Sequence, residues 1–339
     1  MKAVAVLRKG EVGVVDVPVP TIAEYECLVR VQACAFCNGT DLKIIDDQFT
    51  ESGLSYPIIL GHESVGEVVE VGSEVESIRS GDVFTNPIGR LEPGSPYKAL
   101  VGEMKEYCVV QDRAAMEQLG MDRRLYAGAM TRPVPASMAP EDASILLTVK
   151  EAYSALKNFG FAEGMDVLVF GDGPVGLALT RFLRLGNAGW VACIGHHDDR
   201  LDWIRKRGQP DLVLNSQRED VAQEFADRRF DIVIDAVGST DVIKQGSHLL
   251  KPGGKVGVYG VLKRNHSTMA LSGLRNNTTL HMLNFPYQEH AVHDDILEMV
   301  REGAVDPRDY WSHALPADEI ERAVQLVRSR EAFKVVVTF

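Results

Sequence analysis

Two short segments in the first part of the chain carry residue types that bind metal ions. His62 and Glu63 follow an apolar run, residues 57–60, so one strand end presents an imidazole and a carboxylate. Cys37, further upstream, adds a thiolate. All three are preferred zinc ligands, and three protein ligands leave a tetrahedral position open, which is typical of catalytic zinc. We therefore predict one catalytic zinc bound by Cys37, His62 and Glu63.

A neighbouring histidine and glutamate are most often a structural pair without metal, but the surrounding glycines argue for a specific motif. Gly61, Gly66, Gly72 and Val75 fit the spacing GHExxGxxxxxGxxV without a gap. In this motif the chain resembles the zinc-dependent alcohol dehydrogenases of the medium-chain dehydrogenase/reductase superfamily. The resemblance extends from the first expected strand to the last.

The resemblance also implies roles for residues around the zinc cysteine. Thr40 stands at the position of a hydroxyl that relays the substrate proton, and Asp41 at that of an acid that orients the zinc histidine. Lys43 lies where relatives often have a histidine that passes the proton to solvent, although a solvated surface role fits it equally well. The implied catalytic residues are Cys37, Thr40, Lys43, His62 and Glu63.

The chain departs from the family pattern at two places. Asn38 and Gly39 separate the zinc cysteine from Thr40, one residue more than in the common spacing. The position where relatives place a further acidic or cysteine ligand falls on Leu147, with Glu151 one helical turn later and more typical of a helix surface. Three ligands still make a complete catalytic set, so neither departure excludes zinc.

A glycine-rich turn predicts dinucleotide binding. The sequence GDGPVG, residues 171–176, lies between a buried strand, 166–170, and an apolar helix, 177–185. Its glycines permit a tight turn, close approach to a pyrophosphate and close helix–strand packing, and the helix start offers free N–H groups to phosphate. A structural turn without cofactor is the alternative. The expected contacts are Gly171, Gly173, Pro174, Val175 and Gly176.

The residue at the end of the second strand bears on the choice of cofactor. An acid there accepts hydrogen bonds from the adenosine ribose and favours NAD, but in this chain the place falls to Gly195. His196, His197 and Arg200 follow and could donate to a 2′-phosphate. We therefore expect NADP(H) rather than NAD(H). Nearby aspartates partly cancel this charge, so a solvated loop is the alternative reading.

The order of expected elements predicts two domains in an α/β protein. Residues 1–142 contain many short strands broken by glycine and proline, and the resemblance implies a GroES-like β-barrel that residues 287–339 complete. Residues 143–286 alternate strands and helices, which predicts a Rossmann doubly wound parallel sheet. Later strand ends of that sheet add the expected cofactor contacts Val237, Gly238, Tyr259 and Gly260.

Composition narrows the class of protein. The chain has 339 residues and a formal net charge of -12, which argues against nucleic acid or an anionic membrane as partner. No apolar run could span a bilayer and no signal peptide is evident, so a cytoplasmic protein is expected.

The five cysteines are too few and too irregular for a disulfide framework. Relatives often hold a second, structural zinc on four clustered cysteines, but residues 82–106 contain none, so we expect no structural zinc. Cys34, at CxxC spacing with Cys37, is an alternative ligand, although a cysteine at this spacing is more often a thiol packed within a strand. Cys27, Cys108 and Cys193 are expected in the core.

These inferences point to a zinc-dependent oxidoreductase that transfers hydride between NADP(H) and a secondary alcohol or ketone. The ligand set looks like the polyol branch of the family, so a polyol, sugar or cyclitol substrate is expected. A zinc-free quinone or enone reductase of the same superfamily and a non-catalytic nucleotide-binding protein are the alternatives. Relatives form homodimers or homotetramers, and residues 280–285 are a candidate pairing edge.

Overall fold

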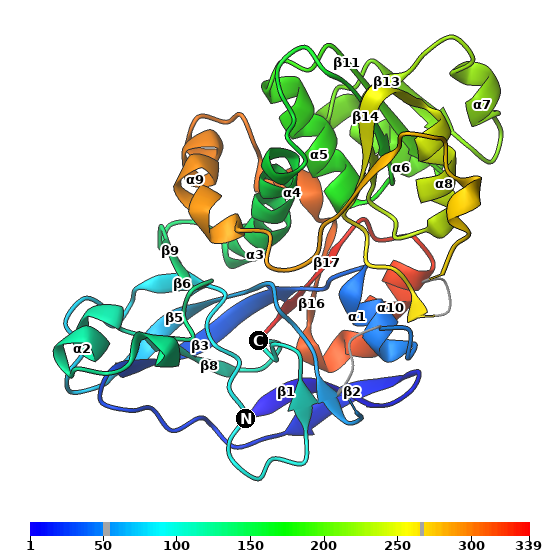
Figure 1. The fold of residues 1–339 in the computed structure, drawn as a ribbon. Coiled ribbons are helices and arrows are strands. Elements are labelled where there is room, and N and C mark those ends of the chain that lie inside the picture. The colour runs from blue at the N-terminus through cyan, green and yellow to red at the C-terminus, as the bar shows by residue number, and fades with distance from the viewer. Residues whose placement is uncertain (50–54, 265–267) are drawn as a thin grey trace. The chain divides into compact units, whose positions relative to one another are not determined.

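The computed structural model describes residues 1–49, 55–264 and 268–339, and their internal contacts divide the chain into two units (Figure 1). The first comprises Met1–Asp47, Glu51–Leu147 and Trp311–Phe339, and the second Gln48–Thr50 and Thr148–Tyr310. None of the described helices is both long and apolar enough to cross a membrane.

The boundaries in the structure lie later in the chain than the sequence-based ones, 142/143 and 286/287. The main reason is that residues 287–310 pack within the second unit. Nε and Nη2 of Arg181 donate to the Ala304 carbonyl at 3.0 and 2.8 Å, and Nε1 of Trp203 donates to the Asp309 carbonyl at 2.7 Å. Tyr310, at the end of this segment, is 2% exposed.

The first unit is built on two mostly antiparallel sheets. One has the order β2-β1-β4-β7, and the other has the order β16-β17-β3-β5-β6-β9 with β8 paired to β3. The strands are β1 Lys2–Arg8, β2 Glu11–Asp16, β3 Glu26–Ala35, β4 Ile58–Ile59, β5 Ser64–Val71, β6 Val83–Thr85, β7 Lys98–Ala99, β8 Tyr107–Gln111, β9 Arg132–Val134, β16 His313–Pro316 and β17 Val335–Thr338. The helices are α1 Thr40–Ile45, α2 Arg113–Gln118, α3 Pro140–Ser144 and α10 Ile320–Arg328.

The last strand of the chain belongs to the larger of these sheets. β17 lies antiparallel to β3, with Val336 opposite Ala35, so the C-terminal segment returns to the first unit as the resemblance implied.

Close backbone approach explains two motif glycines. A Cβ at Gly61 would lie 2.5 Å from Met104, and one at Gly66 would lie 2.5 Å from the Arg30 carbonyl oxygen.

The second unit is a Rossmann fold. Its parallel sheet has the order β12-β11-β10-β13-β14-β15, which is the doubly wound order 3-2-1-4-5-6. The strands are β10 Asp166–Phe170, β11 Trp190–Gly195, β12 Leu212–Asn215, β13 Phe230–Asp235, β14 Leu250–Val258 and β15 Thr279–Met282. The helices are α4 Leu146–Asn158, which spans the unit boundary, α5 Pro174–Leu185, α6 Asp198–Arg207, α7 Val221–Glu224, α8 Thr240–His248 and α9 His293–Arg301. The predicted α/β class with a GroES-like and a Rossmann domain is confirmed.

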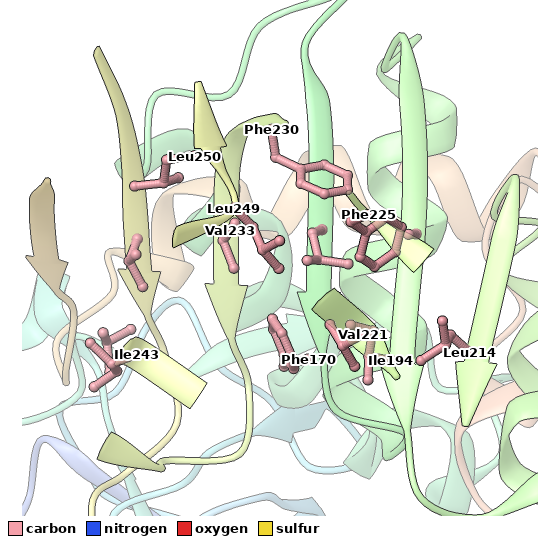
Figure 2. Close-up of a cluster of buried hydrophobic side chains, with 14 residues drawn as sticks. Phe170, Ile194, Leu214, Val221, Phe225, Phe230, Val233, Ile243, Leu249 and Leu250 are labelled. Atoms are coloured by element: carbon pink, nitrogen blue, oxygen red, sulfur yellow. The ribbon is translucent and has the colours of Figure 1, made fainter. Parts of the chain in front are cut away.

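A buried apolar cluster holds one face of this sheet to its helices. Figure 2 shows Phe170 and Ile194 from the sheet beside Val221 of α7, with Ile243 of α8 at the other side of the same cluster. Two rings, Phe225 and Phe230, meet edge to face at 5.2 Å. Such a core fixes the strand ends, and those ends carry the dinucleotide turn.

Candidate functional site

The structure brings the three predicted metal ligands together. The ligand atoms of Cys37, His62 and Glu63 all lie within 4.8 Å of one another, and among the described residues no other three acidic, histidine or cysteine side chains meet in this way. Glu63 as a whole residue is 3% exposed, whereas Cys37 and His62 are half-buried. The donor set of sulfur, nitrogen and oxygen suits zinc.

Antiparallel pairing of β3 with β5 explains why distant residues meet. Cys34 lies opposite Ser64 in the register, and the Ala35 N–H donates to the Glu63 carbonyl at 2.9 Å. Cys37 follows the end of β3, and Glu63 immediately precedes the start of β5. The thiol and the carboxylate therefore emerge side by side at one end of the sheet.

The buried carboxylate of Asp41 lies close to both Cys37 and His62. Its Oδ2 accepts from the Cys37 N–H at 2.9 Å, and its Oδ1 lies 3.9 Å from Nδ1 of His62. Burial raises the pKa of Asp41, although the imidazole of His62 opposes that effect. The Thr40 N–H donates to Sγ of Cys37 at 3.3 Å, so the turn before α1 also holds the sulfur.

A buried lysine beside Glu63 was missed by the sequence analysis. Nζ of Lys334 lies 2.8 Å from Oε1 of Glu63, and both side chains are only 4% exposed. Burial acts to lower the pKa of Lys334, but the negative charges of Glu63 and Cys37 outweigh it and the pKa is raised. A lysine at the start of an apolar final strand is the only signal that the sequence offered.

The protonation of His62 reflects the same crowding of charge. Burial acts to lower its pKa, but a hydrogen bond with Cys37 and the nearby carboxylates of Asp41 and Glu63 raise it well above the usual value. A bound cation would supply the positive charge that these groups attract.

Two further polar side chains fix the backbone of the His-Glu segment. Nδ2 of Asn86 donates to the His62 carbonyl at 2.8 Å. The carboxylate of Glu103 accepts from the Ser64 N–H at 3.0 Å and from its hydroxyl at 2.7 Å. Burial raises the pKa of Glu103 to about 7. Nothing in the spacing of the motif pointed to either residue.

The remaining expected residues of the first unit fall as follows. Thr40 opens α1, and Lys43 one turn later is 8% exposed, which excludes the solvated surface role. Cys34 is fully buried and burial raises its pKa well above the usual value, as expected for a packed strand thiol. Leu147, at the place of a further ligand, is 5% exposed and offers no donor atom.

The other expected core thiols, Cys27, Cys108 and Cys193, are buried in the structure. Glu151, in the second unit, is only partly a surface residue, because the Tyr259 hydroxyl donates to its Oε2 at 2.8 Å.

The turn after β10 has the shape that a pyrophosphate requires. A Cβ at Gly176 would lie 1.9 Å from the Gly171 carbonyl oxygen, so only glycine fits there. A Cβ at Gly173 would meet nothing within 4 Å, which leaves that backbone open to a ligand. α5 begins at Pro174 with Val175 in its first turn, and N–H groups at a helix start have no carbonyl partner within the helix, which suits them to bind phosphate.

The ends of the neighbouring strands complete this edge of the Rossmann sheet. The carboxylate of Asp235 accepts from the N–H groups of Val237 and Gly238 at 2.8 and 2.9 Å. A Cβ at Gly260 would lie 2.0 Å from the Gly238 nitrogen, so the segments that follow β13 and β14 are in contact. Tyr259 is the residue between the end of β14 and Gly260. Val237 is 50% exposed at the open edge.

β11 ends at Gly195, and the loop that follows it carries His196 and His197. Its backbone is tied to Asp172 of the glycine-rich turn, which accepts from the His196 and His197 N–H groups at 2.8 and 3.0 Å. Arg200 lies within α6 and is 5% exposed.

Comparison with known proteins agrees with this geometry. The chain matches the alcohol dehydrogenase GroES-like domain over residues 23–121 and the zinc-binding dehydrogenase family over residues 174–301. It is 24% identical to L-threonine 3-dehydrogenase of Bacillus velezensis, over 95% of this chain and 94% of the relative. It is 24% identical to D-arabinitol dehydrogenase 1 of Uromyces fabae, over 99% and 97% of the two chains. The solved alcohol dehydrogenase of Thermus sp. ATN1 superposes with a TM-score of 0.81 at 25% identity, covering 100% of both chains.

A GroES-like unit with a histidine, cysteine and glutamate cluster, in one chain with a Rossmann unit, defines a dehydrogenase. The chain belongs to the zinc-type alcohol dehydrogenases of the medium-chain superfamily, and it is an oxidoreductase that acts on CH–OH groups.

Proposed function

We propose that the protein is a zinc-dependent dehydrogenase that interconverts a secondary alcohol and its ketone, with a nicotinamide dinucleotide as hydride carrier. The convergence of Cys37, His62 and Glu63 in a partly buried cluster carries this proposal. Zinc at these residues would supply Lewis-acid activation of the substrate oxygen, and the nicotinamide would supply the acceptor or donor of hydride.

The protein's own residues orient the site and move the proton. Asp41 holds the Cys37 backbone and faces the His62 imidazole, so the ligand side chains keep one arrangement. Thr40 opens α1 beside the sulfur, and we assign its hydroxyl to receive the alcohol proton. Lys43, one turn further on α1, is then the next group on the path to solvent.

A polyol, sugar or cyclitol is the proposed substrate class. Relatives of similar coverage include arabinitol and sorbitol dehydrogenases, and L-threonine 3-dehydrogenase also acts on a secondary alcohol by its name. Leu147 supports the same choice, because it leaves Cys37, His62 and Glu63 as a lone set of three protein ligands.

Subunit pairing is proposed at the last strand of the Rossmann sheet. β15 stands at the end of the strand order, so its outer backbone groups have no neighbour within that sheet. Met282, the last residue of β15, and Phe285, three residues further on, are 57% and 63% exposed. We expect a homodimer or homotetramer to form through this edge. Light scattering of the parent protein and of Met282→Lys tests this, and the variant should lose the larger species.

Metal analysis with a substrate panel tests the catalytic proposal. We expect about one zinc ion per chain, as one set of three ligands predicts, and loss of activity on chelation with recovery on addition of zinc. Cys37→Ser should lose zinc, whereas the matched control Cys34→Ala should keep it because Cys34 is fully buried.

Two results would contradict the proposal. Reduction of quinones or enones by a zinc-free protein would favour the alternative reductase. Dinucleotide binding without turnover of any alcohol or ketone would favour a non-catalytic nucleotide-binding protein.

A further inference from the structure

The end of β11 decides whether an unphosphorylated or a 2′-phosphorylated dinucleotide fits best. A Rossmann domain that prefers NAD(H) has an acid there, and its carboxylate accepts hydrogen bonds from the adenosine ribose. In this chain that residue is Gly195, which is why the sequence favours NADP(H). The structure, however, brings a carboxylate to Gly195 from the glycine-rich turn.

That carboxylate belongs to Asp172, the residue between the first two glycines of the turn. A Cβ built on Gly195 would lie 2.6 Å from Oδ2 of Asp172 and 2.8 Å from its Cγ. An aspartate at residue 195 would hold its own carboxylate within two bonds of the same Cβ. Asp172 therefore occupies the region where the missing acid would lie.

Three hydrogen-bonding groups hold this carboxylate in place. Oδ2 accepts from the N–H groups of His196 and His197 at 2.8 and 3.0 Å, and lies 2.8 Å from Nδ1 of His197. Burial acts to raise the pKa of Asp172, but these bonds outweigh it and the pKa is lowered. The group is therefore a fixed negative charge at neutral pH.

The second oxygen remains able to bind a ligand. Among the described residues, the hydrogen bonds to the Asp172 carboxylate all use Oδ2. Oδ1 is not one of the buried polar atoms that lack a hydrogen-bond partner, so it is accessible. The Asp172 side chain keeps 14% of its surface exposed. Oδ1 can therefore accept a hydrogen bond from a hydroxyl at the end of β11.

The cationic groups expected to receive a 2′-phosphate are poorly placed for that role. Arg200 is 5% exposed within α6. Nδ1 of His197 faces the Asp172 carboxylate. Of the three residues, only His196 is classed as exposed. Its own backbone N–H donates to the Asp172 carboxylate.

We infer that Asp172 is the residue that selects the cofactor: its carboxylate accepts from the adenosine ribose hydroxyls and repels a 2′-phosphate, so the protein prefers NAD(H) to NADP(H). This inference rests on the proposed function, because it requires the turn to bind a dinucleotide. It reverses the preference for NADP(H) that was drawn from Gly195. The physical basis is a charge-assisted hydrogen bond from the ribose hydroxyls of NAD(H) and like-charge repulsion of the 2′-phosphate of NADP(H).

Calorimetric titration of the full-length protein with ADP-ribose and with 2′-phospho-ADP-ribose tests the inference without catalysis. We expect ADP-ribose to bind at least about tenfold more tightly. Asp172→Asn keeps an oxygen for the two N–H groups but removes the charge, so the ratio of the two dissociation constants should fall by about tenfold or more. Asp172→Ser carries the same expectation if the asparagine variant does not fold.

A nearby charge change provides the matched control. Asp199 is exposed at the start of α6, and Asp199→Asn removes the same charge without touching the Gly195 region. We expect this variant to change the ratio by no more than about twofold, because exposed charges are screened.

Three results would overturn the inference: equal binding of the two ligands, an unchanged ratio in Asp172→Asn, or an equal shift in Asp199→Asn. Binding requires neither zinc nor alcohol, so a failure of the zinc and turnover assays would leave this measurement standing. If neither ligand binds, the assignment of the turn as a ribose site is refuted.

Discussion

Replacing Lys334 by methionine should destabilise the metal-free protein far more than the zinc-bound protein. Lys334 and Glu63 form a buried ion pair at 2.8 Å, with both side chains 4% exposed. Removing Lys334 leaves the buried Glu63 carboxylate without its hydrogen-bonded cation, and breaking such a pair costs about 3 kcal/mol. For a unit of this size that corresponds to a fall of roughly 6–12 °C in the unfolding midpoint.

Zinc should reduce this cost. A divalent ion beside Glu63 supplies the positive charge that the variant has lost, and Lys334 no longer competes for Oε1. Differential scanning fluorimetry with chelator and with excess zinc measures both states. We expect zinc to raise the midpoint of Lys334→Met by more than that of the parent.

An exposed ion pair in the same unit provides the control. Nζ of Lys2 lies 2.6 Å from Asp318, with side chains 48% and 63% exposed. Lys2→Met should show no measurable change, because exposed pairs contribute little. Equal losses in Lys334→Met and Lys2→Met, or a loss that zinc does not alter, would refute the reasoning. Glu63→Gln added to Lys334→Met should recover part of the stability, because it removes the stranded charge.

Three further changes test other parts of the site. Among the five cysteines Cys37 alone is not buried, so iodoacetamide should add about one label per native chain, and zinc should protect it; mass spectrometry would show several labels if the thiols were accessible. Gly176→Ala places a Cβ 1.9 Å from the Gly171 carbonyl, so dinucleotide binding should fall by about a hundredfold in a calorimetric titration, and unchanged binding would contradict the assigned turn. Asn86→Ala removes the donor to the His62 carbonyl, so kcat should fall by about tenfold with KM little changed, whereas a loss confined to thermal stability would mean a purely structural role.

Local spacing was informative wherever the function of a segment depends on adjacent residues. The GHE motif and the GDGPVG turn could be predicted because several of their glycines stand where the backbone leaves no room for a Cβ. Gly66, which packs against the Arg30 carbonyl, is an example. The doubly wound parallel sheet followed from alternating strands and helices, and such a sheet is found.

Contacts between distant residues could not be predicted in this way. Lys334 reaches Glu63 only because β17 inserts beside β3, and that pairing depends on the whole sheet. Asp172 stands within a predicted motif, yet its effect arises from the position of its carboxylate relative to Gly195. The domain boundary after residue 286 was placed too early because contacts such as that between Arg181 and Ala304 leave no local pattern.

The insertion of β17 beside β3 also affects how the chain can fold during synthesis. The sheet that contains β3, which Cys37 follows, cannot be completed until residues 335–338 have left the ribosome. The second unit, in contrast, consists almost entirely of one continuous segment, Thr148–Tyr310, which can fold earlier. The Rossmann unit is therefore expected to fold first, and the cluster of Cys37, His62 and Glu63 is expected to form late in the biogenesis of this enzyme.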